Sequence, residues 1–323
     1  MKRLVSKYLG LLTGALYGLG LRYFIFEKLH DTINFTDLFS VTFIWIVPLV
    51  IGITPMLFAT DEQLRSRSYK AFTPLFTTLL FFLFCFITRV EDILCILIIA
   101  APFVLGAVIG GLLFGALLLK YRERKNVLYS VLLIPFIAGA IEEQFKIPSG
   151  IYEVKNTVII NSSADNIWKN VVRVQDIKES EYTNGIFNYA GIPRPLYAEL
   201  DRDGIGAKRV GHFEGGLIFK ETVNEWDLNK KVSFNIGIIP SSIRQTIFDQ
   251  HILKGGHFKF VSASYQLTPI SNNKTLLTLS SSYQLDTRIN YYASAWGDML
   301  LSDFQQRLLT VIKNRCEKPG KNL

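Results

Sequence analysis

The chain changes character abruptly near residue 147. Residues 1–146 contain long apolar runs, several of them close to membrane-spanning length, whereas short alternating segments follow from Ile151 onward. A helix needs about 20 apolar residues to cross a bilayer core of about 30 Å, and alternation of apolar and polar residues is typical of strands. The change therefore predicts a membrane region at 1–146, a folded domain at 151–317 and a short tail at 318–323.

Apolar segments can be read in five places before residue 147: about 4–26, 38–59, 71–88, 93–119 and 127–141. The second and fourth are long enough to cross a bilayer, and the third is slightly short. The first is long enough only if it includes Lys7 and Arg22, whose long side chains can reach the interface. The last is short and contains Pro135. The sequence therefore predicts a helical transmembrane bundle of four or five spans.

Basic residues are distributed unevenly among the connecting loops, which predicts orientation. They concentrate before the first segment, between the second and third, and after the fourth, at Lys2, Arg3, Lys7, Arg65, Arg67, Lys70, Lys120, Arg122, Arg124 and Lys125. Positively charged loops stay in the cytoplasm, so the N-terminus is expected inside a multi-pass protein of the cell membrane. Five spans, the favoured count, place the folded domain outside the cytoplasm, and four keep it inside.

Glycines recur every fourth residue in two of the apolar segments, at Gly10, Gly14 and Gly18, at Gly106 and Gly110, and at Gly111 and Gly115. Such spacing lets helix backbones approach closely in lipid. Packing within the bundle is the ordinary interpretation, and a homo-oligomer through these faces is the alternative. Asp, Glu and His are absent from the middle of the apolar segments, which argues against a transporter.

The second half predicts one long antiparallel sheet and one long helix. Val154–Asn161 is the first expected strand, and Ser162-Ser163-Ala164-Asp165 then offers N-cap chemistry for a short helix. A second short helix is expected over 177–187. Further strands are expected near 197–201, 207–214, 217–227, 231–239, 257–269 and 275–286. Apolar residues three and four apart from Ile289 to Ile312 predict a final amphipathic helix over 289–316. This order indicates an α+β domain.

Charge and cysteine patterns exclude several functions. The net charge of +8 is spread over both halves without a basic tract, so nucleic acid is not an expected partner. Cys85, Cys95 and Cys316 form no CxxC pair, and no glycine-rich loop leads into a helix with Lys-Ser/Thr. We therefore expect no disulfide framework, no metal and no cofactor.

Short motifs follow one another in the second half: Ser163–Trp168, Gly191–Leu196, Gly204-x-Gly206-Ala207-x-Arg209, Phe219-x-Glu221-x-Val223-x-x-Trp226, His251, Trp296-Gly297-Asp298 and Arg307–Leu309. In this order they resemble the START-like, or polyketide cyclase/dehydrase (SRPBCC), superfamily over residues 153–317. The resemblance implies a helix-grip fold, in which the last helix closes over the concave face of the sheet and leaves an apolar cavity. Members bind lipids, sterols, polyketides or hormones, and only some are enzymes.

Candidate ligand-contacting residues come from one strand, one loop and the last helix. Phe219, Glu221 and Val223 share one strand face by the two-residue period, so we expect Glu221 to point into the cavity. A carboxylate there has three interpretations: an acid or base with a raised pKa, a ligand contact, or half of an ion pair with an arginine. His251 is a candidate contact to a ligand or to Glu221, and a surface or capping histidine is the more ordinary interpretation. Tyr292 and Trp296 lie on the apolar stripe of the last helix, as core or as cavity lining.

The leading functional hypothesis is a membrane-anchored module that binds a hydrophobic small molecule or lipid without catalysis. A tethered cavity samples a membrane-dissolved ligand at high effective concentration. The second hypothesis is a cyclase/dehydratase-like or hydrolytic enzyme with Glu221 as its base and His251 assisting; neither is committed as catalytic. In the third, side chains fill the cavity and the domain is an interaction surface only.

Overall fold

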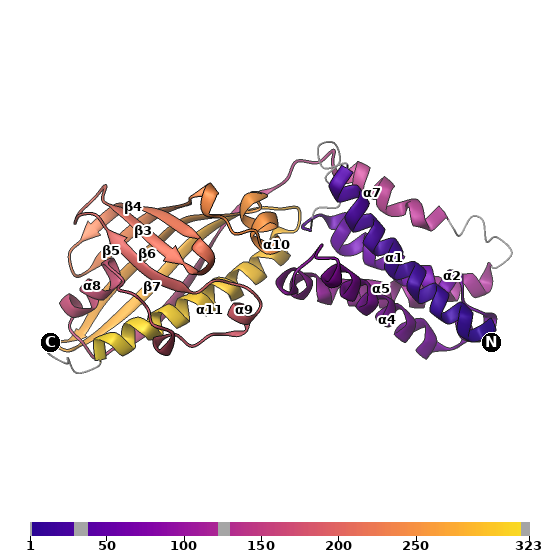
Figure 1. Ribbon diagram of the computed structural model, residues 1–323, viewed down its shortest axis with the longest axis horizontal. Coiled ribbons are helices and arrows are strands. Elements are labelled where there is room, and N and C mark those ends of the chain that lie inside the picture. Colours follow the sequence, from indigo (N-terminus) through magenta and orange to yellow (C-terminus); the bar gives the residue numbers. More distant parts are fainter. Residues whose placement is uncertain (1, 29–37, 122–129, 318–323) are drawn as a thin grey trace. The chain divides into compact units, whose positions relative to one another are not determined.

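The computed structural model describes residues 2–28, 38–121 and 130–317. The chain divides into two compact units, one formed by residues 1–148 with 287–289 and the other by 149–286 with 290–323 (Figure 1). The expected tail at 318–323 lies outside the described residues. Each unit has a core of its own and is described separately.

The first unit consists of helices. The long ones are α1 (Lys2–Lys28), α4 (Arg67–Ile87) and α5 (Ile93–Lys120). A π-helical turn, Thr42–Ile46, continues into α2 (Val47–Leu57), and α3 (Asp61–Arg65) precedes α4. A 3₁₀ turn, Ser130–Leu133, continues into α7 (Ile134–Glu142). By length and composition, α4 and α5 could each cross a membrane. Two such helices do not by themselves distinguish a membrane bundle from a buried helical core.

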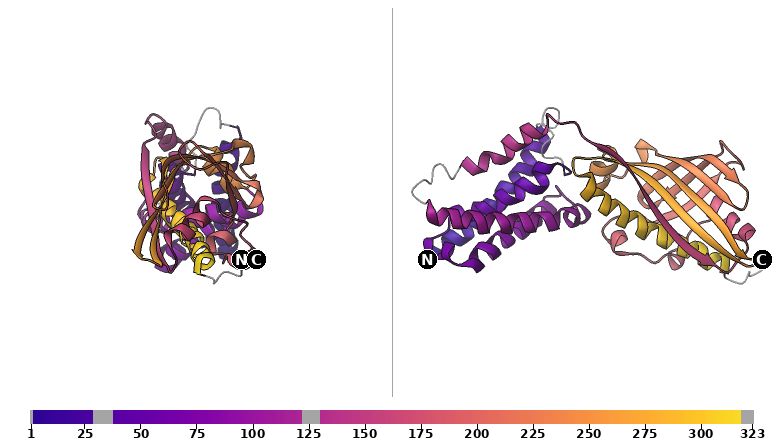
Figure 2. Two further views of the ribbon diagram at one scale, coloured as in Figure 1. Left: turned by 90° about the vertical axis from the view of Figure 1, so that its left-hand side faces the viewer. Right: turned by 180° about the vertical axis from the view of Figure 1, so that it is seen from behind.

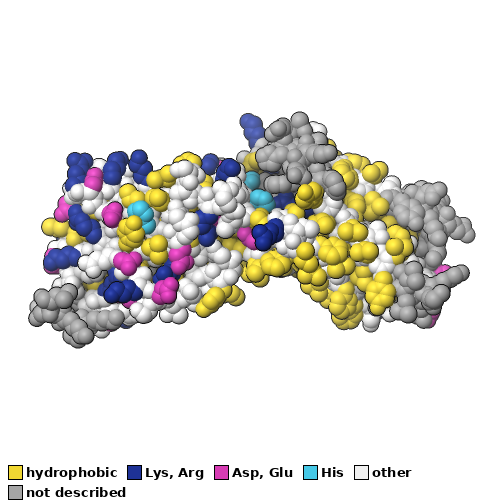
Figure 3. Space-filling model, in the orientation of Figure 1, with side chains coloured by type: hydrophobic (Ala, Val, Ile, Leu, Met, Phe, Trp, Pro, Cys, Tyr) yellow, Lys and Arg dark blue, Asp and Glu magenta, His cyan; other side chains and the backbone are white. Residues whose placement is uncertain are grey.

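Apolar side chains cover much of the outside of this helical unit. Hydrophobic residues dominate its visible face in Figure 3. Large exposed examples come from every long helix: Leu9, Leu12 and Leu16 on α1, Phe72, Phe76 and Leu83 on α4, and Leu105, Ile109 and Leu113 on α5. Contiguous apolar surface of this kind is unusual for a protein surrounded by water.

The glycine faces pack inside the helical unit. A Cβ atom at Gly14 would lie 2.6 Å from Thr77 Cγ2 on α4, and one at Gly18 would lie 2.6 Å from Ile51 Cδ1 on α2. Gly110 likewise faces the backbone of Leu49. The ordinary interpretation of the spacing, close packing within the bundle, describes these contacts. At these glycines the helix faces are already covered by neighbouring helices of the same chain, so they are not free for the homo-oligomer considered from the sequence.

Arg22 departs from the sequence expectation. Instead of extending to an interface it is 1% exposed, and its Nε lies 2.5 Å from Glu91 Oε1 in the turn between α4 and α5. Its guanidinium also lies 5.1 Å from the centre of the Phe43 ring. A paired charge can be buried where a lone charge cannot, and the partner comes from a turn 69 residues away along the chain.

The second unit is a seven-stranded antiparallel sheet that curls around one helix (Figures 1 and 2). The strands are β1 (Ser149–Ile160), β2 (Pro195–Leu200), β3 (Lys208–Phe213), β4 (Ile218–Asp227), β5 (Lys231–Ile238), β6 (Phe258–Ser271) and β7 (Lys274–Asp286). Their order is β1-β7-β6-β5-β4-β3-β2, so β2 to β7 form a continuous meander and β1 joins its far edge. Helix α8 (Ala164–Val172) follows β1, and α11 (Asn290–Glu317) ends the described chain. This is a helix-grip arrangement.

One predicted element is wrong. The short helix expected over 177–187 is a 3₁₀ turn at Glu179–Glu181 and a separate short helix, α9 (Ile186–Tyr189). Tertiary contacts hold this segment extended: Val174 bridges to Ala198 beside β2, and Arg315 on α11 binds Glu181 at 2.8 Å. These contacts outweigh the weak helix propensity of a short polar stretch.

Helix α11 lies on the concave face of the sheet. Its buried residues include Leu308, Leu309 and Ile312, which pack with Val223 and Phe234 from the sheet in one apolar core. Gly297 permits a close approach, because a Cβ there would lie 2.8 Å from the Tyr283 hydroxyl oxygen. The Trp168 and Trp226 rings meet edge to face at 5.0 Å beside α8 and add apolar area at this end.

Candidate ligand-binding cavity

A cavity of about 80 Å³ lies between the concave face of the sheet and α11. Strands β2 to β7 contribute its wall, and Leu301, Phe304 and Leu308 of α11 cover it. The two-residue period of a strand selects the wall residues, because alternate side chains of each strand point to the concave face. The space is far below the roughly 300–1,000 Å³ of a pocket for a drug-sized ligand.

Aromatic rings form much of the wall. Phe213 lies 4.5 Å from Phe219 and 6.0 Å from Phe304, and Phe219 lies 4.8 Å from Phe260, all between ring centres. Phe234 and Tyr265 continue the aromatic lining on β5 and β6. The rings therefore narrow the space between sheet and helix, which accounts for its small volume.

Two charged residues form a polar end of the cavity. Glu221 Oε2 accepts a hydrogen bond from Arg209 Nη1, and the two residues are register partners on β4 and β3. Arg209 Nε also donates to the Val172 carbonyl at the end of α8, at 3.1 Å, and its guanidinium lies 5.0 Å from the Phe234 ring centre. Burial acts to lower the Arg209 pKa, but the nearby Glu221 and Tyr265 raise it overall, so Arg209 stays cationic.

The second carboxylate oxygen of Glu221 is open to a ligand. Oε1 accepts no hydrogen bond from any residue in the described part of the chain, although only 8% of the side chain is exposed. It lies beside Gly211, another wall residue, where an added Cβ would be 3.5 Å away. The absent side chain at Gly211 leaves this oxygen accessible from the cavity.

Tyr265 on β6 supplies a second open polar group. Its side chain is buried and lines the cavity, and its hydroxyl makes no hydrogen bond with any residue that the structure describes. Burial raises the pKa of Tyr265 to about 12, and the Glu221 charge adds to the effect while Arg209 opposes it. The hydroxyl is therefore protonated at neutral pH and can donate a hydrogen bond.

A polar network fixes α11 beside the cavity. Gln305, which is fully buried, donates to Ser281 Oγ at 2.9 Å and accepts from Asn156 at 2.8 Å. Ser281 is itself a wall residue. Since a buried amide loses free energy unless it is bonded, this network sets the position of the helix over the sheet.

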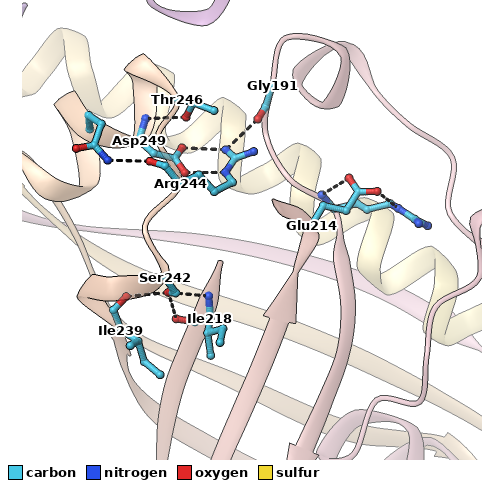
Figure 4. A network of polar contacts seen from close by, with 10 residues as sticks. Gly191, Glu214, Ile218, Ile239, Ser242, Arg244, Thr246 and Asp249 are labelled. Carbon is cyan, nitrogen blue, oxygen red and sulfur yellow. Dashed lines mark hydrogen bonds and ion pairs between the residues drawn. The ribbon is translucent and has the colours of Figure 1, made fainter. Parts of the chain in front are cut away.

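Three segments meet at Arg244 at one end of the wall (Figure 4). Its guanidinium binds both oxygens of Asp249, at 2.7 and 2.9 Å, and donates to the Gly191 carbonyl at 3.0 Å. Its side chain also lies over Gly215, where φ is +72° and a Cβ would be 2.6 Å from Arg244 Cδ. We call these contacts the Arg244 clamp.

Neighbouring contacts link the clamp to the cavity wall. The Ile218 amide donates to Ser242 Oγ at 3.0 Å, and Glu214 binds Arg194 (Figure 4). Three of these residues adjoin a wall residue in sequence: Ile218 precedes Phe219, Glu214 follows Phe213, and Arg194 precedes Pro195. These contacts place the clamp near the end of the wall that carries Phe213 and Phe219.

The sequence-derived candidates separate into two groups. Phe219 and Glu221 line the cavity. Val223 is buried deeper in the core, where it pairs with Phe234. His251 is in a π-helical turn, Gln250–Lys254, and neither it nor Tyr292 or Trp296 belongs to the cavity wall. Tyr292 and Trp296 are half-buried and hydrogen-bond to each other near the start of α11.

Sequence reasoning missed Arg209 and Tyr265 as site residues. Arg209 stood in a motif without a role, because its partner could be recognised only from the β3–β4 register. Tyr265 shares one face of β6 with Ala263 and Leu267 by the two-residue period, and this period was the available signal for a cavity-facing hydroxyl.

Comparison with known proteins found similarity to solved structures only. A START superfamily protein from Mycobacterium smegmatis is 13% identical, with 52% of this chain and 99% of that chain covered and a TM-score of 0.36. Norcoclaurine synthase from Thalictrum flavum is 12% identical, with 55% of this chain and 99% of that chain covered and a TM-score of 0.34. The Zhui aromatase/cyclase from Streptomyces sp. R1128 is 13% identical, with 52% of this chain and 95% of that chain covered and a TM-score of 0.33. No protein-family model matches the sequence, and no curated protein matches it.

The assignment of the fold rests on the strand order and on the position of α11. Chemically, the cavity combines a mostly apolar, aromatic wall with polar groups that include the Glu221 carboxylate and the hydroxyls of Tyr265 and Tyr197. Such a site can bind and orient a small hydrophobic molecule. The cavity wall contains no cysteine, and His212 is its one histidine among the described residues.

Proposed function

We propose that this protein is a membrane-anchored binding module that holds a small hydrophobic molecule between the sheet and α11. The observation that carries the proposal is the cavity itself, whose wall is mostly apolar and aromatic and includes the buried Arg209–Glu221 pair. Apolar burial drives entry of such a ligand at about 25 cal/mol per Å². Polar groups then fix its orientation.

The anchoring part of the proposal is supported by the surface of the helical unit. Leucine and phenylalanine side chains face outward along α1, α4 and α5, where a soluble protein would present charged residues. The threonines between these helices satisfy their hydroxyls internally, as Thr77 does by donating to the Thr73 carbonyl at 2.9 Å. Lipid is the environment that suits this distribution of apolar surface.

Binding is better supported than catalysis. Glu221 is held by Arg209, and His251, its proposed assistant, is not part of the cavity wall. A general base must reach the proton that it removes, and one carboxylate oxygen of Glu221 is already bonded to Arg209. The interaction-only alternative requires a filled cavity, and the remaining 80 Å³ distinguishes the observed wall from a filled core.

Filling the cavity tests the binding proposal. Leu301→Trp places a large ring in the space from α11, whereas Met299→Trp on the exposed side of the same helix is the matched control. The full chain is purified in nanodiscs, and single-ring fluorinated probes, 4-fluorotoluene and 4-fluorophenol, are titrated with ¹⁹F NMR against empty nanodiscs. Saturable binding to wild type and to Met299→Trp, lost in Leu301→Trp, is expected. No saturable binding of either probe, or equal binding to Leu301→Trp, contradicts the proposal.

We further propose that the sheet unit lies outside the cytoplasm. Lys70 at the start of α4 packs against Gly115 near the end of α5, so the basic residues around Arg65 and Lys120 share one end of the helical unit. The turn that carries Glu91 is at the other end, because α4 and α5 are antiparallel neighbours. Basic residues favour the cytoplasmic side.

The end of α7 supports this orientation. Glu142 accepts hydrogen bonds at 2.7 Å from the backbone amides of Val41 and Thr42, where the helix containing α2 begins. Phe43, the next residue, packs against Arg22, which binds Glu91. Lys120 thus lies at the basic end and Glu142 at the Glu91 end, which supports the proposal of a fifth crossing between them.

Cysteine labelling in intact cells tests this orientation. The native cysteines Cys85, Cys95 and Cys316 are all buried, so background labelling should be low. Asn272→Cys, in the exposed β6–β7 turn, should react with a membrane-impermeant maleimide, and Ser68→Cys at the basic end should react only after permeabilisation. The reverse pattern would place the sheet unit in the cytoplasm.

A further inference from the structure

We propose that the cavity selects a single-ring molecule bearing a hydroxyl group, which donates to Glu221 Oε1 and accepts from the Tyr265 hydroxyl. The inference rests on the proposed function, since it specifies the ligand of the same cavity. It adds a chemical class: a phenol or a comparably small cyclic alcohol.

The polar requirement follows from two open groups at one end of an apolar space. Glu221 Oε1 is an acceptor without a partner among the described residues, in a side chain that is only 8% exposed. The Tyr265 hydroxyl is a donor that is also without such a partner. Leaving a buried polar group unbonded costs free energy, so a ligand that bonds both is favoured over an apolar ligand of the same shape.

A hydroxyl meets both requirements with one atom. It donates one hydrogen to the carboxylate and accepts one from the tyrosine, whereas a methyl group does neither. A carboxylate on the ligand would instead face Glu221, and the two like charges would repel. An ammonium would satisfy Glu221 but could not accept from Tyr265, and Arg209 would repel it. Glu221 and Tyr265 together therefore favour a ligand with a neutral hydroxyl group.

The size requirement follows from the wall. An apolar cavity of about 150 Å³ is known to hold benzene, and pockets for drug-sized molecules are larger than about 300 Å³. At about 80 Å³, this space must widen by movement of the bordering Phe213 or Phe304 ring to hold one small ring, and the proposal limits the ligand to that size. A sterol or a two-chain lipid exceeds it several-fold. The aromatic wall then offers edge and face contacts to that ring.

The experiment compares two probes that differ only in the hydroxyl. The full chain in nanodiscs is titrated by ¹⁹F NMR with 4-fluorophenol and with 4-fluorotoluene, and each isotherm is corrected for partition into empty nanodiscs. We expect 4-fluorophenol to bind about tenfold more tightly than 4-fluorotoluene, the effect of one to two net hydrogen bonds. A two-ring probe, 4-fluoro-1-naphthol, should bind at least about tenfold more weakly than 4-fluorophenol.

Two variants test whether Tyr265 and Glu221 are the residues that bind the hydroxyl group of the probe. Tyr265→Phe keeps the Arg209–Glu221 pair, so it should fold, and it should weaken 4-fluorophenol binding about threefold while leaving 4-fluorotoluene unchanged. Glu221→Gln should weaken 4-fluorophenol binding further. Its folding is checked by the near-ultraviolet circular dichroism spectrum, and Tyr265→Phe provides the decision if Glu221→Gln does not fold.

The outcomes separate this inference from the proposed function. Equal affinity for both probes, or an equal loss of both in Tyr265→Phe, overturns the hydroxyl inference but leaves a hydrophobic binding module. Tighter binding of the naphthol overturns the size argument alone. Absence of saturable binding by all three probes overturns the proposed function together with the inference.

Discussion

The Tyr283 hydroxyl on β7 lies 2.6 Å from Asp298 Oδ1 on α11, to which it donates a hydrogen bond. It is also 3.0 Å from the Ser294 carbonyl oxygen, one turn earlier on the helix. Burial raises the pKa of Tyr283, so the hydroxyl remains a donor over the physiological range. The contact ties the first half of α11 to the sheet, and Gly297 leaves room for the tyrosine ring between them.

Adding one methyl group at this contact should loosen α11. In Gly297→Ala the new Cβ would lie 2.8–2.9 Å from Tyr283 atoms, closer than packed atoms tolerate. Although alanine favours helix by about 1 kcal/mol over glycine, overpacking costs about 1–3 kcal/mol. We expect a net loss of unfolding free energy in a urea titration followed by tryptophan fluorescence. Ala295→Ser, at an exposed position of the same helix, is the control and should change little.

Removing one member of the buried ion pair should be more damaging than removing both. Arg209→Met leaves Glu221 buried and unpaired, which costs about 3–5 kcal/mol. The double variant Arg209→Met with Glu221→Leu removes the unpaired charge and should recover much of the loss. Chemical unfolding of the single and double variants measures the difference. Equal instability of the two would mean that the unpaired Glu221 charge is not what destabilises Arg209→Met.

Alkaline pH should destabilise the sheet unit through Tyr265. Its pKa is about 12 in the folded protein, against about 10 in the unfolded chain. The stabilisation associated with this raised pKa is fully present below about pH 10 and is lost as the pH rises from about 10 to about 12. Tyr265→Phe should therefore show a shallower fall in unfolding free energy over this interval. The difference between the tyrosinate absorbance titrations of wild type and Tyr265→Phe should give the pKa directly.

Breaking the Arg244 clamp should open one end of the cavity. Arg244→Ala removes a bidentate pair with Asp249 and the bond to the Gly191 carbonyl. We expect faster amide hydrogen exchange in residues 188–194 and 240–255, measured by mass spectrometry, and faster probe exchange by ¹⁹F NMR. Arg173→Ala, which breaks an exposed pair with Asp203, is the matched control. Unchanged exchange in both segments would show that other contacts close this end.

Enlarging a glycine of the helical unit should disrupt packing within one chain. Gly110 faces the Leu49 backbone, so Gly110→Val cannot fit without separating α2 from α5. A lower melting temperature in nanodiscs is expected, with the mass by light scattering unchanged. Ala116→Val, at an exposed position of α5, serves as the comparison. A change of mass with an unchanged melting temperature would instead indicate that Gly110 lies at an interface between chains.

Strand and helix positions in the sheet unit were largely predictable. Residues of β4 such as Phe219, Glu221 and Val223 alternate with polar neighbours, and the apolar stripe of α11 repeats every three or four residues. These periods follow from local backbone geometry, so they are visible without tertiary information. The segment at 177–187 was not predictable in this way, since Arg315 and the bridge to Ala198 decide its conformation.

The sequence by itself determined the division near residue 147, the strand order along the chain and the inward direction of Glu221, because hydrophobic periodicity selects which face of an element is buried. Only the tertiary structure decided what Glu221 meets. Arg209 is its register partner on β3, Tyr265 reaches the same end from β6, and the phenylalanine rings reduce the remaining space to about 80 Å³. Strand register and ring packing depend on contacts between residues distant in sequence, and a period along one strand contains no information about them.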